Sequence, residues 1–388
     1  MKKKIAILGS TGSIGKSLIN ILKKDSNKIQ ISLLTTNTNY KELLKQANFF
    51  KVKNIIITNK KCFLIVKKSL NNKRFNIYNN FSSIPEIFKN INIDYTMSAI
   101  SGFAGLDPTL RMIKFTKEIA IANKESIICG WGLIKDQLSK YKTEFIPVDS
   151  EHFSIWSLIS STKNNYIDKV YITASGGPFK DRPLNTFQSI IPRDALKHPN
   201  WVMGKKISID SATMMNKVFE IIEAKKIFNF NYNQLQILIH SQSYIHAIIK
   251  FSNGLTKMLI HDTDMTIPIF NSLYHKSDKK IKSNKINLPI LNNLSLTNVE
   301  IKRFPVVKII DLLPSKDSLF ETILVSANDT LVDLFLNKQI KFTDISKQLL
   351  KIVKMKEFKV YKSKYPKDIR EITKLANYVS LKIHSMSI

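Results

Sequence analysis

Cysteine is scarce in this sequence. Among its 388 residues only Cys62 and Cys129 occur, far apart and outside any Cys-x-x-Cys spacing. Such a pair supports neither a disulfide framework nor a zinc site. Because this usage fits a reducing compartment, we expect a cytoplasmic protein.

Long apolar runs are also missing. No stretch reaches the ~20 consecutive apolar residues that a membrane-spanning helix requires. The run Ile5–Leu8, which follows a short basic stretch, stops at Gly9 and is too short for the apolar core of a signal peptide. We therefore expect no membrane partner.

Acidic residues are few, since 30 Asp and Glu stand against 60 Lys and Arg, a formal net charge of +30. Such an excess favours nucleic acid, an anionic membrane surface or small anions as partners. The lysines, however, are scattered among abundant Asn and Ile, without an arginine-rich arm, zinc-finger spacing or aromatic RNA-binding signature. This distribution is what a codon bias toward A and T would produce by placing Lys on solvated faces, so we expect no nucleic acid.

The first part of the chain alternates strand-like and helix-like segments. The strand-like runs are 4–8, 29–34, 54–58, 75–78, 95–99, 118–122 and 144–148. Alternation of this kind predicts a doubly wound parallel sheet of the Rossmann-like α/β class.

A glycine-rich turn, Gly9-Ser-Thr-Gly12-Ser-Ile-Gly15, separates the first strand from a helix. Glycines let the backbone turn tightly and approach a pyrophosphate at the helix N-terminus. The spacing departs from the commoner Gly-x-Gly-x-x-Gly, so a tight turn without a ligand stays the alternative.

Polar clusters follow three of the later strands, at 99–102, 123–125 and 149–151. Ligands bind beyond the carboxyl ends of parallel strands, where these clusters fall. If the extended geometry continues, Asp149 and Glu151 point the same way and suit a hard divalent cation. The alternative is a helix N-terminus with acidic residues in its first turn.

The segment 198–224 holds most of the parts of a site for a charged ligand. If a helix begins at or near Ser211, its N-terminus and the side chains of Asn216 and Lys217 suit a phosphate. Glu220, which shares a helix face with Glu223, then supplies a third carboxylate for the cation. The alternative is that Ser211 merely caps the helix and the glutamates are solvated.

Two loops complete this region. Ser175-Gly-Gly-Pro178 follows the strand-like run 170–174 and either offers backbone N–H groups to a phosphate or forms a plain turn. The loop His198–Gly204 carries Trp201, which either covers a ligand or packs on the core.

Beyond this region, 236–239, 246–251 and 255–260 predict strands of an antiparallel sheet. We expect four segments. They are a dinucleotide-binding domain at 1–149, a central α/β catalytic domain at 150–274, a linker at 275–298 and a helical C-terminal domain at 299–388.

These motifs closely resemble the 1-deoxy-D-xylulose 5-phosphate reductoisomerase family, essentially from end to end. The most specific are Ala-Asn-Lys-Glu-Ser, Pro-Val-Asp-Ser-Glu-His, Ala-Ser-Gly-Gly-Pro-Phe, Lys-His-Pro-Asn-Trp and Asp-Ser-Ala-Thr-Met-Met-Asn-Lys. The resemblance implies a homodimeric enzyme that uses NADPH and a divalent cation to rearrange and reduce a phosphorylated sugar, 1-deoxy-D-xylulose 5-phosphate. The product would be 2-C-methyl-D-erythritol 4-phosphate, on the non-mevalonate route to isoprenoids.

The resemblance also implies roles for single residues. Contacts to NADPH would come from Thr11, Gly12, Ser13, Ile14, Asn123, Glu125 and Gly204. Mg²⁺ or Mn²⁺, with Co²⁺ as a further candidate, would be held by Asp149, Glu151 and Glu220. Contacts to the substrate would come from Lys124, Ser150, Glu151, Ser175, His198, Trp201, Met203, Ser211, Asn216, Lys217 and Glu220. The catalytic residues among all of these would be Lys124, Asp149, Glu151, His198 and Glu220.

The sequence departs from many relatives after the second strand, where it reads Asn37-Thr38-Asn39. No carboxylate stands there to repel a 2′-phosphate, and all three side chains can donate hydrogen bonds to it. None of the three carries a positive charge. We therefore expect NADPH to be preferred over NADH, by a smaller ratio than in relatives with Lys or Arg at position 38.

Two other functions stay open. A different NAD(P) oxidoreductase, of the aspartate-semialdehyde or homoserine dehydrogenase type, would explain the first domain without requiring three carboxylates to converge. A nucleic-acid-binding protein would explain the charge, and its affinity would fall steeply with salt.

Overall fold

The computed structural model describes residues 2–69, 74–160, 166–201 and 203–386. The chain forms two compact units. The first comprises Met1–Ser126, Gly132–Asp149 and Met265–Ile281, and the second comprises Ile127–Trp131, Ser150–Asp264 and Lys282–Ile388.

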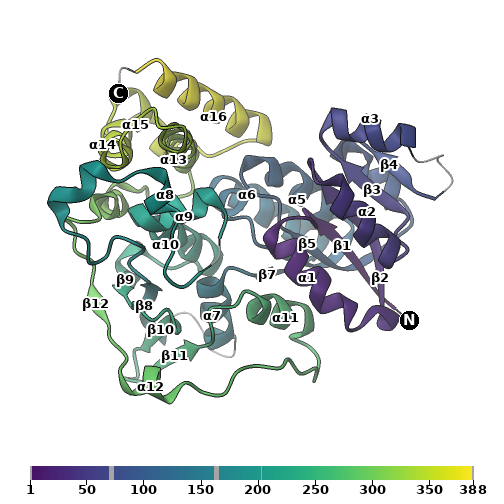
Figure 1. Ribbon diagram of the computed structural model, residues 1–388, viewed down its shortest axis with the longest axis horizontal. Coiled ribbons are helices and arrows are strands. Elements are labelled where there is room, and N and C mark those ends of the chain that lie inside the picture. The colour runs from purple at the N-terminus through teal and green to yellow at the C-terminus, as the bar shows by residue number, and fades with distance from the viewer. Residues whose placement is uncertain (1, 70–73, 161–165, 202, 387–388) are drawn as a thin grey trace. The chain divides into compact units, whose positions relative to one another are not determined.

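The first unit is built on a seven-stranded parallel sheet with the strand order β4-β3-β2-β1-β5-β6-β7 (Figure 1). The strands are β1 (Lys3–Leu8), β2 (Ile29–Thr36), β3 (Asn54–Ile57), β4 (Asn76–Tyr78), β5 (Ile93–Ser98), β6 (Thr116–Ile121) and β7 (Glu144–Pro147). The connecting helices are α1 (Ser13–Lys23), α2 (Tyr40–Phe49), α3 (Lys60–Ser69), α4 (Ile84–Ile87), α5 (Leu106–Ile113) and α6 (Lys124–Tyr141). The predicted doubly wound sheet is confirmed.

Strand β1 lies near the middle of this sheet, and its residues Ile5–Leu8 are fully buried. An unbroken apolar run is what a strand covered on both faces requires. This is why the sequence reveals the sheet by continuous runs rather than by alternation.

The segment 265–281 returns to the first unit. From the sequence we expect residues 265–274 in the catalytic domain and residues 275–281 in a linker. Its helix α11 (Thr266–Tyr274) contacts α1, and Ile269, Phe270 and Leu273 belong to the core that covers β1. Burial of this apolar face explains the return, which local sequence patterns do not encode.

The second unit contains a five-stranded mixed sheet with the order β11-β10-β8-β9-β12. Its strands are β8 (Ile167–Ala174), β9 (Leu235–Ile239), β10 (Ile245–Phe251), β11 (Thr256–Ile260) and β12 (Thr297–Asn298). The expectation of purely antiparallel strands is wrong for β9, which runs parallel to β8. The chain between them forms a helical crossover, which returns it in the same direction.

Helices cover this sheet and fill the C-terminal part of the unit. They are α7 (Ser150–Ile159), α8 (Pro192–Ala195), α9 (Lys205–Thr213), α10 (Met215–Phe228), α12 (Leu288–Asn292), α13 (Phe320–Leu336), α14 (Phe342–Ile352), α15 (Lys356–Lys359) and α16 (Ile369–His384). Helix α10 packs on β8 and β9, and α7 packs on β10 and β11. Helix α13 packs against α14 and α16, and these three helices belong to the helical C-terminal part of the unit.

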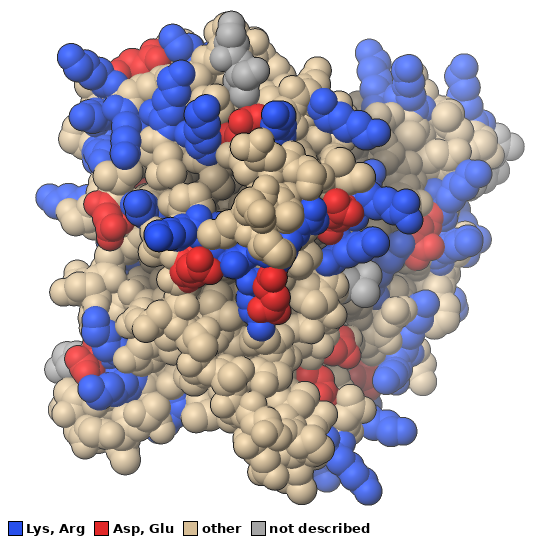
Figure 2. All heavy atoms as spheres, turned by 60° about the vertical axis from the view of Figure 1, so that its left-hand side comes forward, with Lys and Arg blue, Asp and Glu red and all other residues tan. Residues whose placement is uncertain are grey.

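Charge on the face drawn in Figure 2 is mixed, because Lys and Arg are spread over it with fewer Asp and Glu between them. No helix within the described residues is long and apolar enough to cross a bilayer.

Candidate functional site

The glycine turn between β1 and α1 is tightly packed. Gly9 has a φ of +82°, and a Cβ atom on Gly15 would lie 2.4 Å from the carbonyl oxygen of Gly9. Helix α1 therefore begins directly against the turn, with Gly12 and Ser13 exposed and the first backbone N–H groups at its start. Its first turn contains no acidic residue, so the positive end of the helix suits an anion.

The residues after β2 are exposed, but two of their side chains already have partners. Asn39 caps α2 by accepting a hydrogen bond from the N–H of Glu42, at 3.4 Å. The Oδ1 atom of Asn37 accepts one from the Thr58 hydroxyl, at 3.2 Å. Thr38 lies between them with an exposed side chain.

The polar clusters after β5, β6 and β7 lie close together, as predicted. Asn123 caps α6 and donates from its amide to the carbonyl of Gly102, at 2.8 Å, which shapes the loop after β5. Lys124, buried in the first turn of α6, lies 3.1 Å from Asp149 Oδ2 beyond β7. Glu125 is buried beside them in the same turn.

The extended geometry expected for Asp149 and Glu151 is wrong, because helix α7 begins at Ser150 and has Glu151 in its first turn. The backbone of this segment instead follows the alternative, in which an acidic residue stands in the first turn of a helix. Even so, carboxylate oxygens of Asp149, Glu151 and Glu220 lie within 4.8 Å of one another. Three oxygen donors at such separations fit a hard divalent cation.

The expected helix start at Ser211 is also wrong. Ser211 lies in the last turn of α9, and Met214, with a φ of +72°, separates α9 from α10. The helix that carries Asn216, Lys217 and Glu220 therefore begins at Met215. A left-handed non-glycine residue is costly, and such conformations concentrate at functional sites.

Lys217 lies between two glutamates. Its Nζ atom donates to Glu220 at 2.6 Å and to Glu151, and Glu220 is 1% exposed. Burial alone would lower the pKa of Lys217, but the charges of Glu151 and Glu220 outweigh it and raise the pKa from 10.5 to about 12. The carboxylates of Glu151 and Glu220 thus hold the ammonium between them, and Asn216 adds an amide hydrogen bond to Glu220.

His198 is held as a neutral imidazole. Its Nδ1 atom accepts hydrogen bonds from the backbone N–H groups of Asn200 and Trp201, at 3.1 and 2.9 Å. The proton therefore sits on Nε2, which donates to the Ser175 hydroxyl at 3.1 Å. Burial, with a smaller contribution from the charge of Lys217, lowers the pKa of His198 from 6.5 to about 4.

The turn after β8 packs on the end of α9. Gly177 has a φ of +65°, and a Cβ atom there would lie 2.8 Å from the carbonyl oxygen of Ser211. Ser175 accepts a hydrogen bond from the N–H of Gly177, at 3.1 Å. Ser175, His198 and Ser211 are thereby brought together in the second unit.

The loop before α9 leads from His198 to Gly204, which is the N-cap of that helix. The Trp201 ring lies edge-on to the ring of His246, with 6.1 Å between the centroids. Trp201 and Met203 are half-buried, and a Cβ atom on Gly204 would meet nothing within 4 Å.

Two supporting side chains have roles that the sequence does not predict. Asn200 donates from its amide to Ser243 Oγ and to the carbonyl of Ser241, both at 2.7 Å, and this anchors the loop. The buried His152 lies 2.9 Å from the carbonyl oxygen of Glu220 through Nε2 and 3.9 Å from Glu223 through Nδ1. His152 is the last residue of the motif Pro-Val-Asp-Ser-Glu-His, which does not reveal its contact with α10.

Comparison with protein families gives three matches. They are the model described as 1-deoxy-D-xylulose 5-phosphate reductoisomerase over residues 5–131, its C-terminal domain over residues 145–228, and a DXP reductoisomerase C-terminal domain over residues 260–379.

Individual relatives agree. A 1-deoxy-D-xylulose 5-phosphate reductoisomerase of Pelagibacter ubique is 63% identical over 387 residues, covering 100% of both chains. One from Phocaeicola vulgatus is 35% identical over 351 residues, covering 89% of this chain and 90% of the relative.

Solved structures agree as well. The Zymomonas mobilis reductoisomerase in complex with NADPH superposes with a TM-score of 0.89 at 29% identity, covering 100% of both chains. A DOX-P reductoisomerase in complex with NADPH, fosmidomycin and magnesium superposes with a TM-score of 0.90 at 29% identity, covering 99% of this chain and 98% of that one.

The protonation of His198 is open to direct measurement. Since its folded pKa lies below 6.5, the unfolded chain takes up the proton first as the pH falls. His198 thus contributes stability that is complete above pH 6.5 and is lost as the pH falls toward about 4. Long-range ¹H–¹⁵N spectra should show the proton on Nε2 at neutral pH, and His198→Gln should flatten the pH dependence of unfolding in that window. A titration midpoint at the ordinary value would contradict this assignment.

Proposed function

The chain belongs to the 1-deoxy-D-xylulose 5-phosphate reductoisomerase family, and from that premise we propose how its own residues divide the work. It uses NADPH and magnesium to convert 1-deoxy-D-xylulose 5-phosphate to 2-C-methyl-D-erythritol 4-phosphate. The observation that carries the residue assignment is the group of three carboxylates with Lys217 between two of them.

The substrate phosphate binds at the start of α10 and the turn after β8. Ser175, Ser211, Asn216 and Lys217 supply hydroxyl, amide and ammonium donors, which suit a dianion. His198 adds its Nε2–H group, already directed at Ser175. Because this imidazole is neutral, it donates a hydrogen bond without needing a protonation step.

The divalent cation is held by Asp149, Glu151 and Glu220, and their all-oxygen donor set fits Mg²⁺ and Mn²⁺, with Co²⁺ as a further candidate. When bound, such an ion supplies Lewis-acid polarisation of the carbonyl and hydroxyl oxygens of the substrate. Ser150, whose hydroxyl donates to Glu151, orients that ligand and contacts the substrate. Lys217 then exchanges part of its contact with the glutamates for the phosphate.

The reaction rearranges the carbon skeleton to an aldehyde, which takes a hydride from NADPH. Lys124, held beside Asp149, places a positive charge near the reacting oxygens. Trp201 and Met203 close over the substrate, which keeps water from the reactive intermediate. Binding energy from the phosphate drives that closure, so remote contacts lower the barrier to the chemical step.

NADPH binds at the glycine turn. Thr11, Gly12, Ser13 and Ile14 receive the pyrophosphate at the start of α1, where backbone N–H groups are exposed. Asn37, Thr38 and Asn39 face the 2′-phosphate. Asn123 and Glu125 shape the end of the site beyond β6, and Gly204, the N-cap of α9, contacts the cofactor.

A homodimer in the cytoplasm completes the proposal. The dimer follows from the family resemblance. The location follows from the scarcity of cysteine and from the lack of a long apolar run in the sequence. Light scattering coupled to size-exclusion chromatography measures the oligomeric state directly.

Oxidation of NADPH in the presence of 1-deoxy-D-xylulose 5-phosphate tests the metal ligands. Glu220→Gln should leave the fold intact but lower kcat/KM at limiting Mg²⁺ by at least ~100-fold, because it removes a charged ligand. The matched control is Glu223→Gln, since Glu223 is equally buried in the same helix but faces His152. Equal losses in the two variants, or near-normal turnover of Glu220→Gln, would refute this ligand set.

Cofactor choice tests the residues after β2. NADPH should be preferred over NADH, because no carboxylate stands at the end of β2. Thr38→Lys should widen the preference about tenfold by adding a charge–phosphate contact, and Thr38→Asp should narrow or reverse it. The measurement is the ratio of kcat/KM for the two cofactors. A ratio at or below unity in the unmodified enzyme would show that these residues do not read the 2′-phosphate.

A further inference from the structure

A pair of glutamates lies on neighbouring strands of the first unit, away from the residues discussed so far. Glu118 on β6 and Glu144 on β7 are register partners in the parallel sheet. Two like charges directly opposite each other destabilise a sheet. Glu118, whose side chain is 12% exposed, is also shielded from water. The pair therefore needs a cation.

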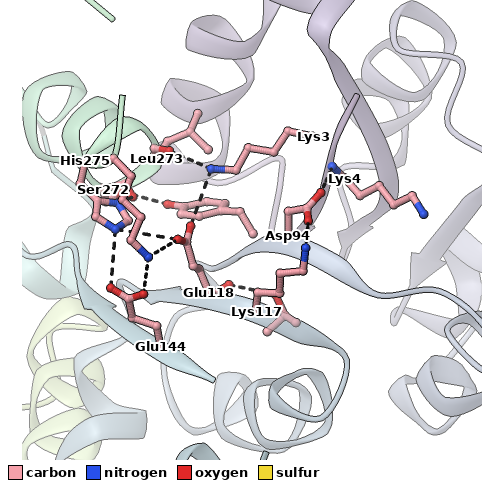
Figure 3. A network of polar contacts seen from close by, with 12 residues as sticks. Lys3, Lys4, Asp94, Lys117, Glu118, Glu144, Ser272, Leu273 and His275 are labelled. Atoms are coloured by element: carbon pink, nitrogen blue, oxygen red, sulfur yellow. Dashed lines mark hydrogen bonds and ion pairs between the residues drawn. The ribbon is translucent and has the colours of Figure 1, made fainter. Parts of the chain in front are cut away.

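The end of helix α11 brings an imidazole to this pair. His275, the residue that follows α11, is 11% exposed, and its Nε2 atom lies 3.8 Å from Glu118 Oε1 and 3.6 Å from Glu144 Oε1 (Figure 3). Metal–ligand bonds of about 2.0–2.2 Å place tetrahedral ligand atoms roughly 3.4 Å apart. The two distances from His275 thus exceed that spacing by only a few tenths of an ångström, and the ligand atoms of all three residues lie within 4.8 Å of one another. The three residues come from three separate segments of the unit.

Two lysines currently neutralise the glutamates. Lys276 Nζ lies 2.8 Å from Glu118 Oε1 and 2.5 Å from Glu144 Oε2, and Lys3 Nζ lies 3.7 Å from Glu118 Oε2. Lys276 is 59% exposed, so its ammonium can swing into water at little cost. A divalent cation between the carboxylates would displace it, because a double charge with direct bonds replaces a solvated single charge.

The cluster is accessible and separate from the cofactor turn. Glu118 and His275 line a cavity of about 230 Å³, through which an ion and a water ligand can enter. Glu144 is the first residue of β7, whereas the glycine turn follows the last residue of β1. In a parallel sheet the N-terminal and C-terminal ends of the strands lie on opposite sides, so Glu144 and the glycine turn are far apart along the strand direction.

We propose that Glu118, Glu144 and His275 form a second metal site, for Zn²⁺, with water as the fourth ligand. One imidazole with two carboxylates suits zinc, whereas the all-oxygen set of Asp149, Glu151 and Glu220 suits magnesium. The site fastens the returning segment 265–281 to strands β6 and β7. Its role is structural and independent of the reaction.

An ion-pair network without a metal makes the opposite prediction for one variant. Lys276→Met removes the ammonium that competes with zinc, so it should tighten zinc binding by about two- to fivefold, as expected for the loss of an exposed ion pair. If these residues formed only an ion-pair network that binds no metal, the same change would leave zinc binding unchanged. Lys117→Met is the matched control, because exposed Lys117 lies next to Glu118 in sequence but pairs with Asp94 at 2.8 Å.

The experiment uses the full chain after removal of metals with a chelator. Zn²⁺ alone is titrated against a chromophoric competitor in the Asp149→Asn background, because Asp149 belongs to both other groups among the described residues that could hold a metal ion. These groups are Asp149, Glu151 and Glu220, and Asp149, His152 and Glu223. We expect one zinc per chain with a micromolar or lower Kd, lost in His275→Gln and in Glu118→Gln and tightened in Lys276→Met. In the otherwise unmodified enzyme, His275→Gln should retain Mg²⁺-dependent NADPH oxidation, which shows that it folds.

Three results would overturn the proposal. They are zinc binding that persists in both His275→Gln and Glu118→Gln, a Kd no better than millimolar, or an equal response of Lys276→Met and Lys117→Met. Replacement of zinc by Co²⁺ provides a further readout, since an imidazole-ligated tetrahedral site gives intense visible bands. Loss of those bands in His275→Gln, with NADPH oxidation retained, supports the site whatever the identity of the substrate.

Discussion

The candidate site depends on one electrostatic constraint, the burial of Glu151 and Glu220 around the ammonium of Lys217. Removing a carboxylate from water costs several kcal/mol, and an uncompensated pair of them would not stay ionised. Lys217 meets that requirement from the same helix as Glu220 and reaches Glu151 on α7. The two helices are thereby fixed with their carboxylates facing each other, and a cation is always required between them. An ammonium and a divalent ion are alternative ways to satisfy the same pair.

Much of the parallel sheet could be predicted from the sequence, because its strands are covered on both faces and read as continuous apolar runs. The returning helix α11 could not. Its apolar residues are as compatible with one core as with the other, and only the packing of Ile269 and Phe270 against the first unit decides between them. The direction of β9 was missed for a related reason, since pairing with β8 is set by the intervening crossover rather than by the strand itself.

The residue types of the candidate site could be predicted from motifs, but their backbone geometry could not. A helix from Ser211 onward seemed to need no interruption, yet Met214 adopts a left-handed conformation and divides it into α9 and α10. The residue at this break is a methionine rather than a glycine, so the sequence does not predict the left-handed conformation. The same limit applies to Glu151, which stands in a helix rather than an extended segment. Its carboxylate still approaches that of Glu220, because long-range packing of α7 and α10 replaces the local geometry first expected.

The most direct test of the shared cation is the effect of Mg²⁺ on the unfolding of Lys217→Met. Without metal this variant lacks the ammonium that lies between the carboxylates of Glu151 and Glu220, so it should be less stable than the unmodified protein by about 3–5 kcal/mol. Mg²⁺ should restore most of that loss, raising Tm more in Lys217→Met than in the unmodified protein and hardly at all in Lys217→Met combined with Glu220→Gln. A Tm that rises equally in all three proteins, or a metal-free Lys217→Met as stable as the unmodified protein, would contradict the account.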